Sequence, residues 1–161
     1  MTDATLASAW TGTVNGRPEP GAVAERSRRT RARDIRAFTA MTGDRNPLHY
    51  DADLAAASVF GRLIVQGGVT TGLLNALVAE DLPGPGTVFL SVEWSFLRAV
   101  GVGERLTARA EVLSVRDDKP ICTLATTILN ADGQPVLTGR ATTYTVPLRT
   151  ARSQPDPLNG D

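Results

Sequence analysis

Four β-like stretches follow one another in the C-terminal half of the chain, and they constrain the fold more than any other feature. Apolar and polar residues alternate along each stretch, and Val, Thr, Ile and Leu are abundant. Short segments rich in Gly and Asp separate the stretches, so we expect four consecutive strands paired as an antiparallel meander. The predicted strands are residues 87–96, 105–116, 120–130 and 134–146.

A long apolar helix is predicted immediately before these strands, over residues 67–82. Its apolar residues recur at intervals of three and four, and small residues such as Gly68, Gly72 and Ala76 lie between them. A sheet that curls around such a helix would bury it, which predicts an α+β fold with helix and sheet in separate layers. The apolar positions are Val69, Leu73, Leu74, Leu77 and Val78.

A strand and a shorter helix are predicted before the long helix. Residues 21–29 are suited to a strand, and Thr30 is a suitable N-cap for a helix over residues 31–42 that Gly43 would end. One side of this helix is expected to contact the core, and it carries Ile35, Phe38 and Met41.

An irregular but ordered segment is predicted between the two helices, over residues 44–66. Asn46-Pro47 blocks a continuous helix, and Phe60-Gly61 breaks the short Ala-rich turn that is predicted at residues 53–57. Such an excursion from regular structure is a common place for functional residues.

The composition fits one compact domain. With 161 residues, 42% of them hydrophobic, the chain can bury a core but is short for two domains. We expect a single domain over residues 21–147. Residues 1–20 and 148–161 are predicted to be flexible, because they mix polar residues, Pro and Gly without periodicity.

Charge and cysteine content exclude several functions. Seventeen basic residues balance seventeen acidic ones, so no net field attracts nucleic acid or an anionic membrane, and no apolar run approaches the roughly 18 residues of a membrane span. Cys122, the single cysteine, cannot form an internal disulfide and is predicted to be a buried thiol in a cytoplasmic protein. A single histidine without clustered ligands predicts neither a metal site nor a cofactor.

The chemistry of the chain is predicted to centre on Asp44 and His49. His49 is the only histidine, and an imidazole can take and give a proton near neutral pH. The backbone freedom of Gly43 and the fixed bend at Pro47 would let the segment fold back, so that the carboxylate and the imidazole share a water molecule.

The sequence from Phe38 to Ala55, with its Gly-Asp-x-Asn-Pro-Leu-His motif, resembles the signature of the MaoC-like (R)-specific enoyl-CoA hydratases, or hydratase 2 family. The similarity extends over roughly residues 22–147 and includes Phe60-Gly61-Arg62-Leu63-Ile64-Val65 and the segment 82–87. It implies a hot-dog fold, in which a curved antiparallel sheet wraps a long central helix and a loop and helix overhang carries the site. It further implies a homodimer acting on a thioester of coenzyme A or of acyl carrier protein.

The resemblance also implies roles for individual residues. Asp44 and His49 would hold a water molecule, one taking its proton while the other supplies a proton to the substrate α-carbon in a syn addition, and the roles reverse in dehydration. Asn46 would orient the water or His49. Gly67, at the start of the long helix, would supply a backbone N–H to the thioester oxygen. The expected substrate-binding residues are Asn46, Phe60, Gln66 and Gly68.

The chain departs from the family pattern in the segment before the long helix. Gln66-Gly67 stands where the family usually has His-Gly, and Gly68 stands where a large apolar residue is typical. Glutamine forms hydrogen bonds but does not titrate, so we expect altered substrate fit or loop support rather than loss of the acid/base pair. The small residues Gly68 and Gly72 predict either room for a bulky acyl chain or close approach of a neighbouring element.

Two other functions remain open from the sequence. A hot-dog thioesterase would direct water to the carbonyl carbon, which the Asp-x-Asn-Pro-Leu-His motif disfavours. A noncatalytic scaffold subunit could pair with an active homologue, although Asp44, Asn46 and His49 are all present.

For the hydratase interpretation, Arg62 or Arg98 could meet a phosphate of coenzyme A or acidic residues of a carrier protein.

Overall fold

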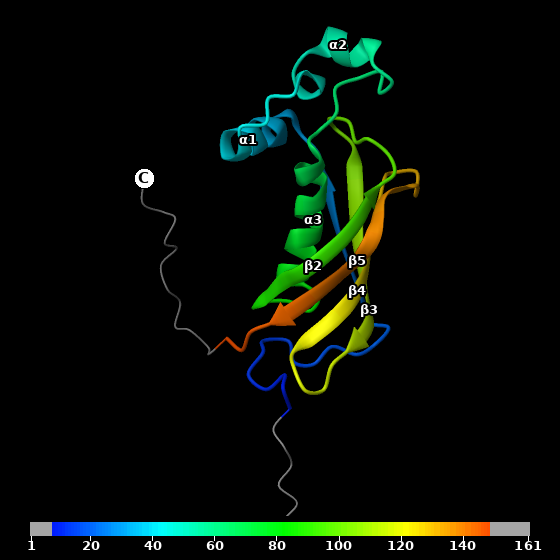
Figure 1. Cartoon of the computed structure of the whole chain (residues 1–161). Coiled ribbons are helices and arrows are strands. Elements are labelled where there is room, and N and C mark those ends of the chain that lie inside the picture. The colour runs from blue at the N-terminus through cyan, green and yellow to red at the C-terminus, as the bar shows by residue number, and fades with distance from the viewer. Residues whose placement is uncertain (1–7, 149–161) are drawn as a thin grey trace, which may run out of the picture.

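A single five-stranded antiparallel sheet forms the body of the protein (Figure 1), as seen in a computed structural model that describes residues 8–148. The strands lie in the order β1-β3-β4-β5-β2, so β1 and β2 are the two edges. Their bounds are Val23–Arg29 for β1, Thr87–Phe96 for β2, Arg105–Val115 for β3, Ile121–Leu129 for β4 and Pro135–Thr145 for β5.

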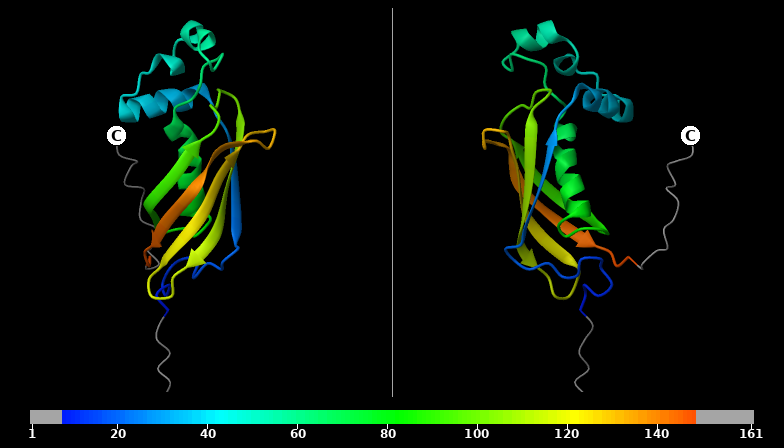
Figure 2. Two further views of the ribbon diagram at one scale, coloured as in Figure 1. Left: turned by 45° about the vertical axis from the view of Figure 1, so that its right-hand side comes forward. Right: turned by 180° about the vertical axis from the view of Figure 1, so that it is seen from behind.

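The central helix α3 (Gly67–Glu80) lies along one face of the curved sheet (Figures 1 and 2), and it contacts β1, β2 and β3. The core between the two layers contains fully buried Leu74 and Leu77 from α3, and Leu124 and Ile128 from β4. Burial of each such side chain stabilises the fold by about 1.5–3 kcal/mol. The predicted α+β hot-dog architecture is confirmed, with a long central helix wrapped by a curved sheet.

The predicted four-strand meander is wrong for its first strand. Strands β3, β4 and β5 pair in sequence, but β2 pairs with β5, with Val92 opposite Ala141. The place beside β3 that a meander would give to β2 is occupied by β1, whose Ala24 pairs with Ala110. The connection from β2 to β3 therefore runs from one edge of the sheet toward the other.

Helix α1 (Ala32–Thr42) begins one residue later than predicted. Its N-cap is Arg31, whose backbone N–H donates to the Asp34 carboxylate over 2.8 Å. The hydroxyl of Thr30 instead donates to the carbonyl of Gly101 over 2.7 Å. The N-cap prediction for Thr30 is wrong because this side chain links the end of β1 to the β2–β3 connection.

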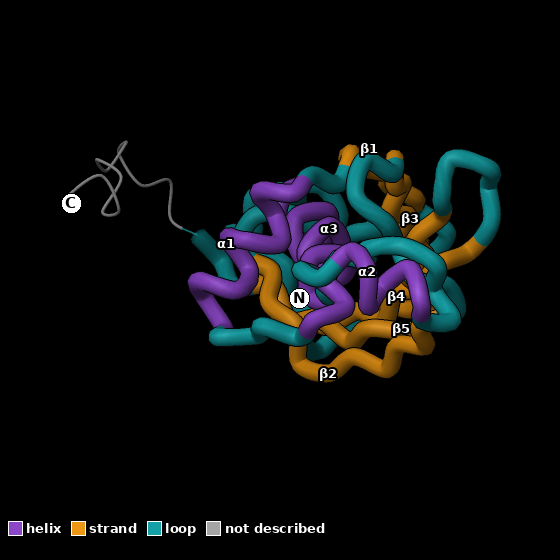
Figure 3. The backbone as a smooth tube through the Cα atoms, turned by 90° about the horizontal axis from the view of Figure 1, so that it is seen from above, coloured by secondary structure: helices purple, strands orange, loops and turns teal. Residues whose placement is uncertain are grey.

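The predicted buried face of α1 is only partly correct. Ile35 is buried, whereas the side chain of Met41 is 74% exposed. Met41 lies in the last turn of α1, which projects past α3 when the molecule is seen from above (Figure 3). Met41 borders an open cavity between α1 and α3 instead of packing into the core.

Residues 43–66 form an excursion at the end of the sheet where α3 begins (Figures 1 and 2). It contains the 3-10 turn η1 (Pro47–His49) and the short helix α2 (Ala52–Ala57). The predicted irregular segment is thus present, and its Ala-rich turn is a short helix.

Residues 8–20, part of the segment expected to be flexible, make specific contacts with the body. Trp10 is buried, and its indole N–H donates to the carbonyl of Arg116 over 3.0 Å. The side-chain amide of Asn15 donates to the carbonyl of Pro83 over 3.1 Å. The folded body therefore takes in residues before position 21. The rest of the expected flexible ends, residues 1–7 and 149–161, lies outside the described residues.

Cys122 is buried on β4, as predicted, and desolvation raises the pKa of its thiol. This environment disfavours the reactive thiolate. Within residues 8–148, no helix combines the length and apolar character needed to span a membrane.

Candidate active site

Asp44 is positioned by a sharp turn at the end of α1. Gly43 adopts the left-handed conformation, with a φ of 80°, and its N–H donates to the carbonyl of Thr39 over 2.8 Å. This glycine lets the chain reverse direction without steric cost. The Asp44 carboxylate then accepts the backbone N–H of Asn46 over 3.0 Å, which fixes one of its oxygens.

His49 is held at the end of η1. The Asn46 side chain caps this turn by accepting the N–H of Leu48 over 3.1 Å, and Pro47 occupies its first position. The His49 Nδ1 atom lies 2.7 Å from the carbonyl oxygen of Ile64. Because a carbonyl oxygen only accepts, Nδ1 carries the hydrogen, and Nε2 is the ring nitrogen left for other chemistry.

The structure brings Asp44 and His49 together. His49 Nε2 lies 3.6 Å from Asp44 Oδ2, and the side chains are 8% and 36% exposed respectively. This separation is too long for a direct hydrogen bond. A water molecule fits between the two atoms, accepting from the one that carries a proton and donating to the other.

Gln66, the N-cap residue of α3, supports the Asp44 turn through Thr39. Its buried side-chain amide donates to the hydroxyl of Thr39 over 3.2 Å and to the carbonyl of Ile35 over 3.3 Å. The Thr39 hydroxyl in turn donates to the carbonyl of Asp44 over 2.7 Å and accepts from the phenol of Tyr50. Gln66 thus contacts Thr39, the residue that supports the Asp44 turn.

An apolar cavity of about 340 Å³ lies at the start of α3. Phe60 from the excursion and Gly67 from α3 both line it, as do Phe96 and Ile64. Asp44 and His49 are not among its lining residues, and Ile64 provides the link, because its carbonyl holds His49. A Cβ atom at position 67 would lie 3.1 Å from the Phe96 ring, so glycine permits the close approach of this ring to the start of α3.

Gly68 lines a different cavity, of about 300 Å³, between α1 and α3. The ring of Phe38 occupies the space that a side chain at position 68 would need. Gly68 therefore permits close approach of Phe38, which is one of the two interpretations of these small residues. Around Gly72, by contrast, no other atom would contact an added Cβ.

Three functional contacts were missed by sequence reasoning. Thr39 carries the hydrogen bonds that support Asp44, Tyr50 donates to Thr39, and Ile64 orients His49 through its backbone. Thr39 lies four residues after the buried Ile35 on α1, so helical spacing gave a signal that it points inward. A backbone carbonyl such as that of Ile64 leaves no trace in the sequence.

Comparisons with known proteins define the class. The chain belongs to the MaoC-like domain family, whose model matches residues 14–132.

Individual relatives agree with this assignment. The chain is 42% identical to an (R)-specific enoyl-CoA hydratase of Aeromonas caviae over 76% of its own length and 92% of that protein. It is 36% identical to a 3-hydroxybutyryl-CoA dehydratase of Methylorubrum extorquens, covering 67% of this chain and 68% of that one. The solved (R)-hydratase of A. caviae involved in PHA biosynthesis superposes with a TM-score of 0.76 at 40% identity, covering 80% of this chain and 98% of that one.

Proposed function

We propose that this protein is a hydro-lyase that adds water to trans-2-enoyl thioesters to give (R)-3-hydroxyacyl thioesters, and removes it in the reverse direction. The observation that carries this conclusion is the facing pair of Asp44 Oδ2 and His49 Nε2, 3.6 Å apart. The imidazole of this pair is held by the backbone of Ile64, a residue that also lines the apolar cavity. Family membership and similarity to named hydratases and a dehydratase support the same reaction.

Asp44 and His49 serve as the acid/base pair, and the pair carries one exchangeable proton besides that on Nδ1. The basic member takes a proton from water as the oxygen forms its bond to the β-carbon. The acidic member gives its proton to the α-carbon on the same side of the double bond. One proton has then moved from the acid to the base, and its return restores the pair for the next turnover.

Gly67 stabilises the enolate-like oxygen of the thioester. It is the first residue of α3, so its N–H has no acceptor within the helix and lies at the positive end of the helix dipole. A single such donor contributes about 3 kcal/mol in comparable sites. Phe60 lines the same cavity and contacts the acyl chain.

Gln66 and Asn46 hold the backbone that carries Asp44 and His49. The amide of Gln66 reaches Thr39, and the side-chain oxygen of Asn46 caps η1. Both contacts set the position of the acid/base pair, so the replacement of the usual family histidine by Gln66 is compatible with catalysis.

A homodimer is the assembly we propose. Strand β2 is an edge of the sheet and exposes a row of large apolar side chains, which a second copy would cover by pairing along this edge. Val92→Lys is expected to shift the protein to monomers in sedimentation analysis. The exposed residues are Val88, Leu90, Val92 and Phe96.

A cytoplasmic location, suggested by the single buried Cys122, stays a prediction.

The test of the proposed function is incubation with crotonyl-CoA and longer enoyl-CoAs, with loss of enoyl absorbance as the readout. We expect hydration, with the (R)-3-hydroxyacyl product identified by chiral analysis. Enoyl thioesters of acyl carrier protein and 3-hydroxyacyl thioesters extend the substrate set. Absence of turnover with every member of this set would contradict the proposal.

A further inference from the structure

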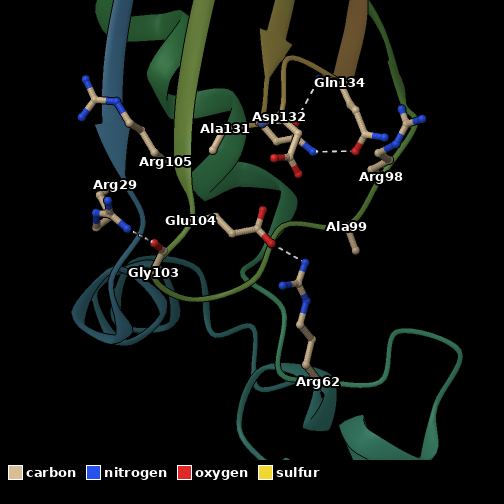
Figure 4. Close-up of a pocket in the computed structure, with 11 residues that line it drawn as sticks. Arg29, Arg62, Arg98, Ala99, Gly103, Glu104, Arg105, Ala131, Asp132 and Gln134 are labelled. Atoms are coloured by element: carbon tan, nitrogen blue, oxygen red, sulfur yellow. Dashed lines mark hydrogen bonds and ion pairs between the residues drawn. The ribbon is translucent and has the colours of Figure 1, made fainter.

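A second cavity, of about 490 Å³, adjoins the apolar one at Arg98 and Ala99, which line both. It is polar, and it lies between the β2–β3 connection and the β4–β5 turn (Figure 4). Four arginines line it, against two acidic residues, in a chain whose net charge is zero. The arginines are Arg29, Arg62, Arg98 and Arg105, and the acidic residues are Glu104 and Asp132.

Most of this positive charge is not neutralised by carboxylates. Arg62 forms an ion pair with Glu104. Arg29 donates to the backbone carbonyl of Gly103, and Arg98 donates to that of Pro135 over 2.6 Å. These carbonyl contacts orient two guanidinium groups and leave their charges and other N–H groups available.

Arg29 and Arg105 also face each other across neighbouring strands. They are directly paired residues of β1 and β3, at the end of the ladder that borders the cavity. Like charges in direct cross-strand positions destabilise a sheet. On the same two strands, Arg109 pairs with Glu25, and the atoms of this ion pair are 3.2 Å apart. The strands thus combine one complementary pair with one repulsive pair, and the repulsive pair is the one at the cavity.

Arg62 is fitted closely into the cavity wall. A Cβ atom at position 101 would lie 3.0 Å from the guanidinium carbon of Arg62, so Gly101 is what lets this group lie against the backbone. In Figure 4, Arg62 and Glu104 lie between Arg98 on one side and Arg29 and Arg105 on the other. The guanidinium groups of Arg29, Arg62 and Arg98 therefore lie around the cavity, whereas that of Arg105 points away from Glu104 in this view.

We propose that this cavity binds the phosphate groups of the carrier to which the acyl chain is attached. The inference rests on the proposed function, because it assigns the acyl group to the adjoining apolar cavity. Coenzyme A and acyl carrier protein both carry a phosphate ester at the far end of the pantetheine arm. Guanidinium groups bind phosphate by charge-assisted, often bidentate hydrogen bonds. An anion here also relieves the repulsion between Arg29 and Arg105.

The test compares Arg29→Gln/Arg105→Gln with the parent protein on three crotonyl thioesters. Crotonyl-pantetheine has no phosphate, crotonyl-4′-phosphopantetheine has the phosphate common to both carriers, and crotonyl-CoA adds the nucleotide phosphates. We expect KM for crotonyl-CoA to rise about tenfold or more in the double variant, while kcat/KM for crotonyl-pantetheine stays the same. Rising salt should raise KM for crotonyl-CoA in the parent and much less in the variant.

Arg109→Gln is the matched control, because it removes one arginine from the same strand pair outside the cavity. Its KM for crotonyl-CoA should stay within twofold of the parent value. An effect already seen with phosphopantetheine assigns the site to the shared phosphate, and an effect seen only with crotonyl-CoA assigns it to the nucleotide phosphates. Equal losses on all three thioesters, or no loss on any, would overturn the inference.

Calorimetric binding of coenzyme A separates this inference from the proposed function. If the parent protein turns over no thioester, the hydratase proposal fails. The phosphate site still predicts that coenzyme A binds the parent protein at least tenfold more tightly than Arg29→Gln/Arg105→Gln. Equal affinity, or no binding to the parent, would reject the phosphate site by itself.

Discussion

The excursion and the body of the protein are stabilised in different ways. In the body, α3 and the sheet enclose leucines with no exposed surface, such as Leu74 and Leu124. In residues 43–66, Leu54 and Val59 are exposed, and side chains such as Asn46 hold the backbone by capping hydrogen bonds. The proposed acid/base pair therefore lies on the less buried region, and its geometry depends on a few hydrogen bonds that connect the excursion to the body.

The largest effect is expected from removing the pair itself. Asp44→Asn and His49→Ala should each lower kcat for crotonyl-CoA by about 10²- to 10⁴-fold, because each removes a proton-transfer group. Circular dichroism of both variants should stay near that of the parent. Urea unfolding should be unchanged for Asp44→Asn, since Asp44 is partly exposed, whereas His49→Ala also removes a buried ring and its contact with Ile64 and should lower stability. Asp53→Asn, in the first turn of α2, is the matched control and should retain activity. Full activity of either pair variant would remove Asp44 and His49 from the mechanism.

Substitutions in the core of the body should change the free energy of unfolding rather than the catalytic rate. Leu74→Ala creates a cavity between α3 and the sheet and should lower the free energy of unfolding by about 2–5 kcal/mol. Its kcat per folded molecule should stay close to the parent value. Leu54→Ala, on the exposed side of α2, should change stability by less than about 0.5 kcal/mol. Urea unfolding measures the stability of both variants. Equal losses of stability in Leu74→Ala and Leu54→Ala would contradict the contrast between the two regions.

Gly68→Ala tests the contact between α1 and α3. The added methyl group would overlap the ring of Phe38, so the ring or the helix must shift. Overpacking of this kind costs about 1–3 kcal/mol, which thermal and urea unfolding can measure. Phe38→Leu in the same chain should recover part of the loss. An unchanged or higher stability of Gly68→Ala would show that the space beside Gly68 is free.

The periodic elements were predictable because their signals are local. The strands after residue 86 and the helix from Gly67 follow from alternation and from spacings of three and four. The partner of β2 was not predictable in this way. Pairing between β2 and β5 joins residues far apart in sequence, and it depends on the place beside β3 that β1 occupies.

The candidate site likewise has a part that the sequence predicts and a part that only the fold reveals. The pairing of Asp44 with His49 follows from a short motif with a glycine turn and a proline bend. The support of that pair does not, because it uses a hydroxyl from α1 and an amide from the start of α3. The place of Gln66 in the sequence indicated a departure from the family pattern, but only the fold connects it to Thr39.

Thr39→Val measures how far this support matters. The variant keeps the shape of the side chain and removes the hydroxyl that donates to the carbonyl of Asp44 and accepts from Gln66 and Tyr50. A small displacement of a catalytic group costs activity, so we expect kcat for crotonyl-CoA to fall about tenfold with little change in KM. The lost hydrogen bonds should also lower stability by about 1–3 kcal/mol.

Thr143→Val separates the two effects. Thr143 is a buried threonine on β5 whose hydroxyl contacts Cys122, far along the chain from the excursion. Its replacement should lower stability by a similar amount and leave kcat unchanged, because no catalytic group depends on it. Thr39→Ser keeps the hydroxyl and should restore kcat. Equal losses of kcat in Thr39→Val and Thr143→Val would show that catalysis does not depend on the hydrogen bonds between the excursion and the body. The contrast drawn between the two regions would then not apply to the candidate site.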